Sequence, residues 1–255
     1  MLETQWETAL TTIRIVLVEP AGALNVGSIA RVMKNMGLTQ MVLVSPHCDP
    51  MSCEAKTMAV HAQDVLESAQ IVDSLPQALI GCQKAIATTA RDRSFDRTLE
   101  HPRTTLPWLL QSPAALIFGP EDRGLSNTEL NYAQRIVRIP SSSAYESLNL
   151  AQAVAVCCYE LSLSAQTLID SSTLPTPEPS EPLSATLDQL EGYYQQLETL
   201  LLKIGYVYPH TVSSRMEKFR HLFNRAQPSS TEVAMLRGVI SQVEWALTVK
   251  QHPPS

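Results

Sequence analysis

Three segments of the chain place glycine and small polar residues where a predicted β-strand meets a helix. They are NVGSIAR (residues 25–31), FGPEDRGL (residues 118–125) and IPSSSAYESLNLA (residues 139–151). In open α/β sheets, ligands bind beyond the carboxyl ends of the strands. Glycine lets the backbone approach a ligand closely, and Asn and Ser side chains supply hydrogen bonds. These junctions are therefore where we expect a site.

Each segment alone also has a purely structural explanation. Asn25 could cap a helix, and Gly119 and Gly124 could allow a turn. Ser147 and Asn149 could satisfy the open end of a helix. No segment matches the G-x-G-x-x-G fingerprint or a phosphate loop, so a standard dinucleotide or nucleoside-triphosphate site is not supported.

Apolar, β-rich runs alternate with helical patterns through the first two thirds of the chain. This alternation predicts an α/β fold with a mainly parallel sheet. The predicted strands are residues 13–20, 41–46, 69–75, 85–90, 113–120 and 135–140. A first helix follows Asn25 as its cap and stops at Gly37, and a later one begins at a Ser126/Glu129 capping box. A longer apolar helix is expected over residues 147–164.

The last third of the chain has a different composition. Residues 166–184 are rich in Pro, Ser and Glu and carry no basic residue, which is typical of an extended linker. Beyond it, amphipathic patterns predict helices over residues 187–206, 213–226 and 230–249. We expect a domain of residues 1–165, a linker of residues 166–184 and a helical extension of residues 185–255.

The overall charge of the chain does not indicate a nucleic-acid partner, since the formal net charge is -6. Only residues 191–255 carry more basic than acidic side chains, seven against five. The five cysteines form no C-x-x-C pair, and the N-terminus lacks an apolar signal core. No apolar run reaches the length of a membrane span. These features predict a cytoplasmic protein with reduced thiols, without a metal and without a membrane partner.

Taken together, the three junction segments are far more specific than any one of them. N-x-G-S-x-A-R, F-G-x-E-x-x-G-L and I-P…S-L-N-L-A-x-A-V resemble, in order and spacing, the motifs of the trefoil-knot (SPOUT) RNA 2'-O-ribose methyltransferases. TTARDR (residues 88–93) is similar to a further segment of that family. The C-terminal part resembles the helical extension of its tRNA cytidine/uridine 2'-O-methyltransferase subgroup.

The resemblance implies a parallel sheet with helices on both faces, a C-terminal deep trefoil knot and a small all-helical C-terminal extension. It also implies a homodimer and a pocket for S-adenosylmethionine, lined by the first turn of the S-L-N helix. The implied cofactor-binding residues are Thr88, Thr89, Ala90, Gly119, Ile139, Glu146, Ser147 and Leu148. Glu146 stands where a small residue is expected, so we expect it to contact a ligand through its backbone.

The resemblance places the catalytic arginine of the family at Arg31, with Asn25, Ser147 and Asn149 assisting. A guanidinium with a pKa above about 12 is a poor general base. We therefore favour a role for Arg31 in binding the substrate phosphate and in stabilising developing alkoxide charge. Glu121 could be a site residue or a structural one, and Pro120 stands where the subgroup often has a basic residue.

Binding of RNA by a negatively charged chain requires local positive charge. The candidates near the site are Arg14, Arg91 and Arg93. In the C-terminal helix they are Arg215, Lys218, Arg220 and Arg225, which alternate with Phe219 and Phe223. The phenylalanines could instead be core and the basic residues a solvated face, and both can hold at once. No DNA partner is expected.

The leading hypothesis is an S-adenosylmethionine-dependent tRNA 2'-O-methyltransferase acting at nucleotide 32 of the anticodon loop. The nearest alternative is the same chemistry on another RNA, such as ribosomal RNA. A non-catalytic RNA-binding module on a knotted scaffold is an alternative of a different class. A small-molecule α/β enzyme comes last, because His47, His61 and His101 stand in no recognisable catalytic motif.

Overall fold

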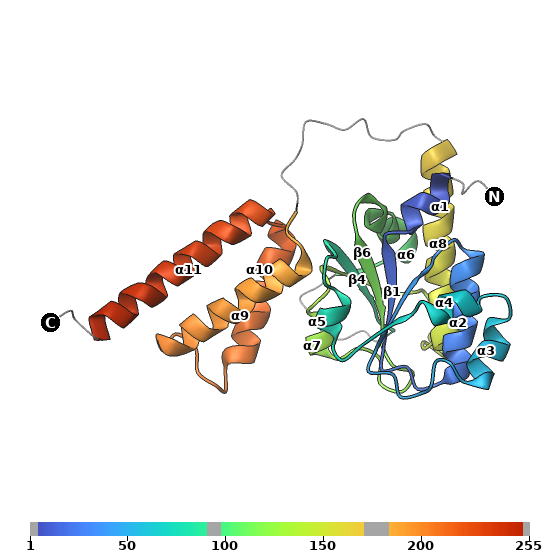
Figure 1. The fold of residues 1–255 in the computed structure, drawn as a ribbon, viewed down its shortest axis with the longest axis horizontal. Helices are drawn as coiled ribbons and strands as arrows, with labels where there is room; N and C mark the ends of the chain where they lie inside the picture. The colour runs from blue at the N-terminus through green and yellow to red at the C-terminus, as the bar shows by residue number, and fades with distance from the viewer. Residues whose placement is uncertain (1–4, 91–97, 171–183, 252–255) are drawn as a thin grey trace. The chain divides into compact units, whose positions relative to one another are not determined.

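A computed structural model of the chain describes residues 5–90, 98–170 and 184–251 (Figure 1). The chain divides into two compact units, residues 1–176 and residues 177–255. The division falls inside the linker expected at residues 166–184, although the last helix of the first unit extends to Asp170 within that range. Each unit is described by itself below.

The first unit is built on one seven-stranded sheet in which every pair of neighbouring strands is parallel. The strand order is β3-β2-β1-β6-β4-β7-β5. The strands are β1 (Ile13–Val18), β2 (Gln40–Val44), β3 (Gln70–Val72), β4 (Lys84–Thr88), β5 (Leu99–Glu100), β6 (Ala114–Phe118) and β7 (Arg135–Val137). Six of them confirm predicted strands. The two-residue β5 is too short to leave a pattern in the sequence.

Helices cover both faces of this sheet, as expected. In Figure 1, α1, α2, α3, α4 and α8 lie on one side and the short α5 and α7 on the other. The helices of the unit are α1 (Gln5–Leu10), α2 (Ala23–Asn35), α3 (Cys53–Ala59), α4 (Gln63–Glu67), α5 (Leu75–Ala78), α6 (Pro102–Thr105), the 3-10 helix η1 (Leu106–Gln111), α7 (Asn127–Leu130) and α8 (Leu150–Asp170). The passage of the C-terminal segment through a loop stays a prediction of the resemblance.

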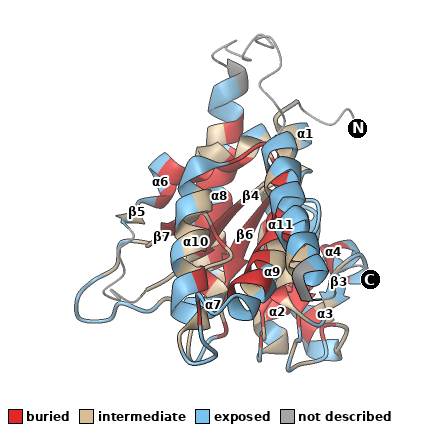
Figure 2. Ribbon diagram, turned by 90° about the vertical axis from the view of Figure 1, so that its left-hand side faces the viewer, coloured by how far each residue is buried: buried red, intermediate tan, exposed pale blue. Residues whose placement is uncertain are grey.

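The core lies between the sheet and the pair α2 and α8. Ile13, Ile15 and Leu17 alternate along β1 and are fully buried against these helices. A buried Leu or Ile side chain contributes about 1.5–3 kcal/mol to stability, so this layer anchors the strand ends that carry the site. Figure 2 shows β6 buried along its length. Helix α2 approaches α3 so closely that a Cβ on Gly27 would lie 2.1 Å from the carbonyl oxygen of Ala55.

Two predicted helix starts are wrong. Helix α2 begins at Ala23 with Gly22 as its N-cap, so Asn25 lies inside the first turn and does not cap it. Helix α8 begins at Leu150, three residues later than expected. The reason is that Asn149 caps this helix: its Oδ1 accepts hydrogen bonds from the backbone amides of Ala151 and Gln152.

Other local predictions are confirmed. Gly37 directly follows the C-cap of α2 and has a φ of +76°, the left-handed conformation that glycine adopts freely. The Ser126/Glu129 capping box is present at the start of α7. Within the described ranges, no helix has the length and hydropathy that crossing a membrane would need.

The second unit is all-helical, as expected. It contains α9 (Leu187–Lys203), α10 (Val212–Ala226) and α11 (Ser230–Gln251). Its core includes Tyr193 and Tyr194 of α9, and the ring of Phe223 packs edge-on against Tyr193 with centroids 5.1 Å apart. Arg220 of α10 forms an ion pair with Glu191 and lies over the ring of Tyr194. This unit therefore has a small core of its own.

Candidate methyl-donor pocket

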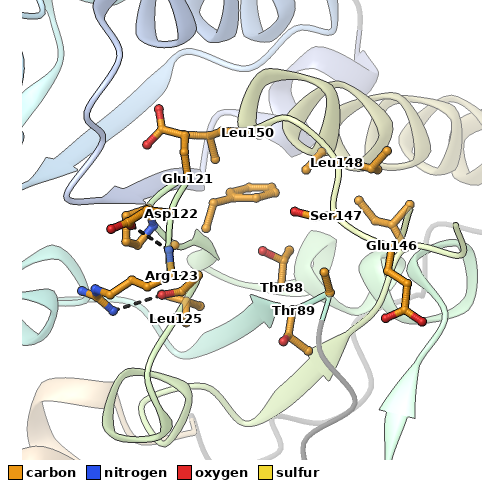
Figure 3. A pocket seen from close by; sticks show the side chains of 17 residues that line it. Thr88, Thr89, Glu121, Asp122, Arg123, Leu125, Glu146, Ser147, Leu148 and Leu150 are labelled. Atoms are coloured by element: carbon orange, nitrogen blue, oxygen red, sulfur yellow. Dashed lines mark hydrogen bonds between the residues drawn. The ribbon is translucent and has the colours of Figure 1, made fainter. Parts of the chain in front are cut away.

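A cavity of about 310 Å³ lies beyond the carboxyl ends of β4, β6 and β7 in the first unit. It collects all eight residues that the sequence implied for cofactor binding, from segments up to 60 positions apart (Figure 3). Its lining consists of Thr88, Thr89, Ala90, Phe118, Gly119, Pro120, Glu121, Asp122, Arg123, Gly124, Leu125, Ile139, Glu146, Ser147, Leu148, Leu150 and Ala153. The second and third predicted junctions therefore meet at this pocket, whereas the first contributes no lining residue.

The Glu121 carboxylate joins the loop after β6 to the start of α2. It accepts hydrogen bonds from the backbone amides of Ala21 and Gly22 at 3.1 and 3.3 Å and from Asn25 Nδ2 at 2.7 Å. Partial burial raises the pKa of Glu121, but the hydrogen bonds from Asn25, Ala21 and Gly22 outweigh it, so the pKa lies below its ordinary value of 4.5. Glu121 therefore keeps its charged form, which accepts these three hydrogen bonds.

Asn25 extends this connection to the third junction. Its Oδ1 accepts a hydrogen bond from Asn149 Nδ2 at 3.1 Å, while its own Nδ2 donates to Glu121. Asn149 also caps α8, so its position is fixed from both sides. Glu121, Asn25 and Asn149 thus form one hydrogen-bonded chain through all three predicted motifs.

Arg123 holds the loop after β6 from the other side. Its guanidinium donates to Glu19 Oε2 at 2.7 Å and to both carboxylate oxygens of Glu129, at 2.8 and 3.0 Å. Hydrogen bonds to both carboxylates raise the pKa of Arg123, so it stays charged. Sequence reasoning missed Arg123 and Glu19, because an ion pair between residues 104 positions apart leaves no signal in a single sequence.

Two glycines make the same loop compact. A Cβ on Gly119 would lie 2.3 Å from the backbone nitrogen of Leu125, closer than any real contact allows. Gly124 has a φ of +63°, a conformation that other residues rarely adopt. Both glycines of the F-G-x-E-x-x-G-L motif are therefore required by the backbone path of the loop that lines the pocket.

In the loop before α8, two neighbouring side chains, those of Ser147 and Glu146, point in different directions relative to the pocket. In Figure 3 the Ser147 hydroxyl points into the pocket, whereas the Glu146 carboxylate points away from it. The Glu146 carboxylate pairs with Arg138 at 3.2 Å, and its backbone oxygen accepts a hydrogen bond from Ser141. This arrangement agrees with the expectation that Glu146 faces the pocket through its backbone.

The pocket does not include the predicted catalytic arginine. Arg31 lies on α2 six residues beyond Asn25, about 9 Å along the helix axis at 1.5 Å per residue. Its side chain is exposed, and no hydrogen bond or ion pair ties it to another described residue. Asn25 itself touches the pocket only through Glu121. The role of Arg31 stays a prediction.

The predicted RNA-binding arginines are scattered. Arg14 lies at the amino end of β1, away from the pocket, and donates to the carbonyl oxygens of Ala78 and Ile80 at 2.9 and 2.7 Å. Arg91 and Arg93 lie outside the described residues. Arg220 is engaged with Glu191, whereas three side chains of the same helix are exposed: Arg215, Lys218 and Arg225.

The described residues contain no group of three or more His, Cys, Asp or Glu side chains that could hold a metal ion. The pocket instead combines apolar walls, three hydroxyl groups and an acidic rim. Glu121 and Asp122 supply the acidic groups, while the Glu146 carboxylate points away to Arg138, and Arg123 is the one cation among the lining residues. Such a lining suits a partly apolar ligand that carries positive charge.

Comparisons with known proteins identify the class to which the two units belong. Residues 12–159 match the sequence model of the SpoU rRNA Methylase family. Residues 188–252 match the model described as the C-terminal domain of the tRNA methyltransferase TrmJ. The first match spans the whole sheet and the pocket, and the second spans the three helices of the second unit.

Individual relatives agree with both matches. A protein of Pectobacterium atrosepticum named tRNA (cytidine/uridine-2'-O-)-methyltransferase TrmJ is 41% identical over 239 residues, which cover 92% of this chain and 98% of that protein. The protein of that name from Klebsiella pneumoniae is also 41% identical over 239 residues. The crystal structure of TrmJ from Z. mobilis ZM4 superposes with a TM-score of 0.79 at 29% identity, covering 91% of this chain and 98% of that one. The chain therefore belongs to the SpoU family of RNA methyltransferases, within its TrmJ group.

Replacing Glu121 by Gln tests the link between the first two motifs. A folded-state pKa below 4.5 means that Glu121 stabilises the protein above that pH and that this contribution disappears as the pH falls through the lowered pKa. At pH 7 we expect Glu121→Gln to lower the free energy of unfolding by about 1–2 kcal/mol, since charge-assisted hydrogen bonds are lost at a partly exposed site.

Urea unfolding between pH 3 and 7 measures this effect. The variant should lose less stability than the wild type on acidification, while Glu54→Gln, at an exposed carboxylate of α3, should follow the wild-type curve. Identical pH profiles for the wild type and Glu121→Gln would show that the carboxylate does not hold the loop.

Proposed function

We propose that this protein transfers a methyl group from S-adenosylmethionine to the ribose 2'-hydroxyl of the cytidine or uridine at nucleotide 32 of tRNA. The observation that carries the proposal is the pocket in which the second and third motifs meet, with Asn25 of the first motif hydrogen-bonded to Glu121 of its lining. The tRNA substrate is supported by the activity for which the relatives at about 41% identity are named, and nucleotide 32 by the motif resemblance alone. The cysteines among the described residues are all free, which supports action in a reducing cytoplasm.

The lining fits S-adenosylmethionine, which supplies an electrophilic methyl group on a positively charged sulfur. Apolar walls at Ile139 and Leu148 suit a purine ring, and the hydroxyls of Thr88, Thr89 and Ser147 suit a polar tail. The acidic rim favours a cation, because the charge of Arg123 is already matched by Glu19 and Glu129. Glu121 and Asp122 are the lining carboxylates left to attract such a charge, since the Glu146 carboxylate pairs with Arg138.

The residues of this chain need to align the hydroxyl and help it lose a proton, because a sulfonium already has a good leaving group. Arg31 is exposed and has no partner among the described residues, so its guanidinium is available for the phosphate next to the target ribose. The same charge stabilises the alkoxide that develops as the hydroxyl reacts. Asn25 and Asn149 keep the start of α2 and the start of α8 together beside the pocket.

Methylation of tRNA by Arg31→Ala tests the proposed role of this side chain. With labelled S-adenosylmethionine and tRNA that lacks the modification, we expect the wild type to place one 2'-O-methyl group at nucleotide 32. Loss of a charge that acts in the transition state should lower kcat by at least roughly 100-fold. Affinity for S-adenosylmethionine should stay unchanged, because Arg31 does not line the pocket.

Lys34→Gln is the matched control, since Lys34 lies on the same helix and is paired with Asp64. It should methylate tRNA at the wild-type rate. Full activity of Arg31→Ala would exclude the proposed catalytic role. Methylation of ribosomal RNA but not of tRNA would favour the alternative substrate, and RNA binding without methyl transfer would favour a binding module.

We also propose that two chains form a homodimer through α8. One side of this helix packs in the core through Val154, Cys158 and Leu161. A second stripe, at Val156, Tyr159 and Leu163, is exposed, with Tyr159 51% accessible. An apolar stripe of this kind on a core helix is typical of a surface that a partner covers.

The mass of the particle in solution tests the dimer. Size exclusion with light scattering should give twice the mass of one chain for the wild type and a single-chain mass for Tyr159→Glu, because a buried unpaired charge opposes association. Ile80→Glu, at an exposed apolar side chain distant in sequence from α8, should remain dimeric. A wild type that is monomeric at micromolar concentration would contradict the proposal.

A further inference from the structure

The loop between α9 and α10 exposes aromatic side chains to solvent. Tyr206 is 62% and Tyr208 57% accessible, and His210 is exposed as well. The rings of Tyr208 and His210 stack, with centroids 5.9 Å apart and planes inclined by 12°. Large aromatic side chains are usually buried, so a stacked and exposed pair is a candidate contact surface.

The loop is held rigid by its own backbone. Gly205, with a φ of +72°, turns the chain at the end of α9. Val207 is 2% exposed and anchors the loop in the core of the second unit, which leaves its neighbours Tyr206 and Tyr208 outside. The backbone oxygen of Tyr208 accepts a hydrogen bond from the Thr211 amide at 2.8 Å, and the Tyr208 amide donates to Thr211 Oγ1 at 3.2 Å. A preordered ring loses little entropy when a ligand binds.

Exposed basic side chains follow this loop along one face of α10. Arg215, Lys218 and Arg225 are exposed, and their spacing of three and seven residues places them on the same side of the helix. They span about 15 Å at 1.5 Å per residue. The neighbouring Arg220 is by contrast engaged with Glu191 and the ring of Tyr194. Residues 204–211 contain no acidic side chain.

We propose that Tyr208 and His210 form a stacking platform for an unpaired nucleobase of the RNA substrate, while Arg215 and Lys218 contact the adjoining phosphates. This inference rests on the proposed function, in that the substrate is an RNA. Base stacking on aromatic rings combined with cations along the backbone is the way single-stranded RNA is held without reading its sequence. Bases of a duplex are already stacked on one another, so a loop of the tRNA is the segment that fits.

Binding of the full-length protein to unmodified tRNA, followed by fluorescence anisotropy at several salt concentrations, tests the platform. Tyr208→Ala should raise the Kd about tenfold, because the stacked ring is lost. Tyr208→Phe keeps the ring and should stay within twofold of the wild type. His210→Ala, a second variant, should raise the Kd about threefold, since it removes only the supporting ring.

The salt dependence separates stacking from electrostatics. Tyr208→Ala should leave the slope of log K against log salt unchanged, whereas Arg215→Gln should reduce it by about one. A purely structural role of Tyr208 would not give this split. Neither variant should change the affinity for S-adenosylmethionine, because neither residue lines the pocket.

The outcomes distinguish this inference from the proposed function. If the wild type neither binds nor methylates tRNA, the proposed function fails and this inference fails with it. If the wild type methylates tRNA but Tyr208→Ala and His210→Ala bind it with wild-type affinity, only the platform is overturned. A change in the mass of the particle caused by Tyr208→Ala, with tRNA affinity intact, would assign the loop to a protein interface and would likewise overturn the platform.

Discussion

The carboxylate of Glu121 is the interaction on which the arrangement of the pocket depends. It binds the backbone at the start of α2 and the side chain of Asn25, which in turn binds Asn149 at the start of α8. These partners are separated by 96 and 124 positions along the chain. The parallel sheet brings their strands to one edge, and this polar chain ties the three loops to one another. A site assembled in this way needs the charged carboxylate, which its lowered pKa preserves.

Much of the fold could be predicted, because buried parallel strands such as β1 and β6 are continuous apolar runs that the sequence displays directly. The eight residues implied for cofactor binding also line one pocket, since they follow neighbouring strands, whereas Arg31 lies outside it. Predictions from local patterns were wrong where a side chain binds a residue distant in the sequence. Asn25 resembles a helix cap, but its side chain binds Glu121. Arg14 was likewise predicted to lie near the site, but its side chain binds the carbonyl oxygen of Ala78. Arg123 gave no signal for the same reason.

The pocket and the side chain of Arg31 lie in different surroundings. The pocket is lined by a loop whose conformation depends on Gly119, Glu121 and Arg123. Arg31, the residue proposed to contact the RNA, lies outside this lining and is exposed to solvent. A chain with a net charge of -6 can still bind RNA if its cations gather locally, as they do along α10.

Calorimetric titration with S-adenosylmethionine tests the central claim most directly, namely that the loop after β6 shapes a donor pocket. The wild type should bind one molecule per chain. Gly119→Ala should bind at least roughly 30-fold more weakly, because its Cβ would lie 2.3 Å from the Leu125 nitrogen and displace the loop, a cost of about 2 kcal/mol or more. Gly238→Ala, where a Cβ meets open space on α11, should bind as the wild type does. No binding by the wild type, or equal binding by Gly119→Ala, would contradict the account.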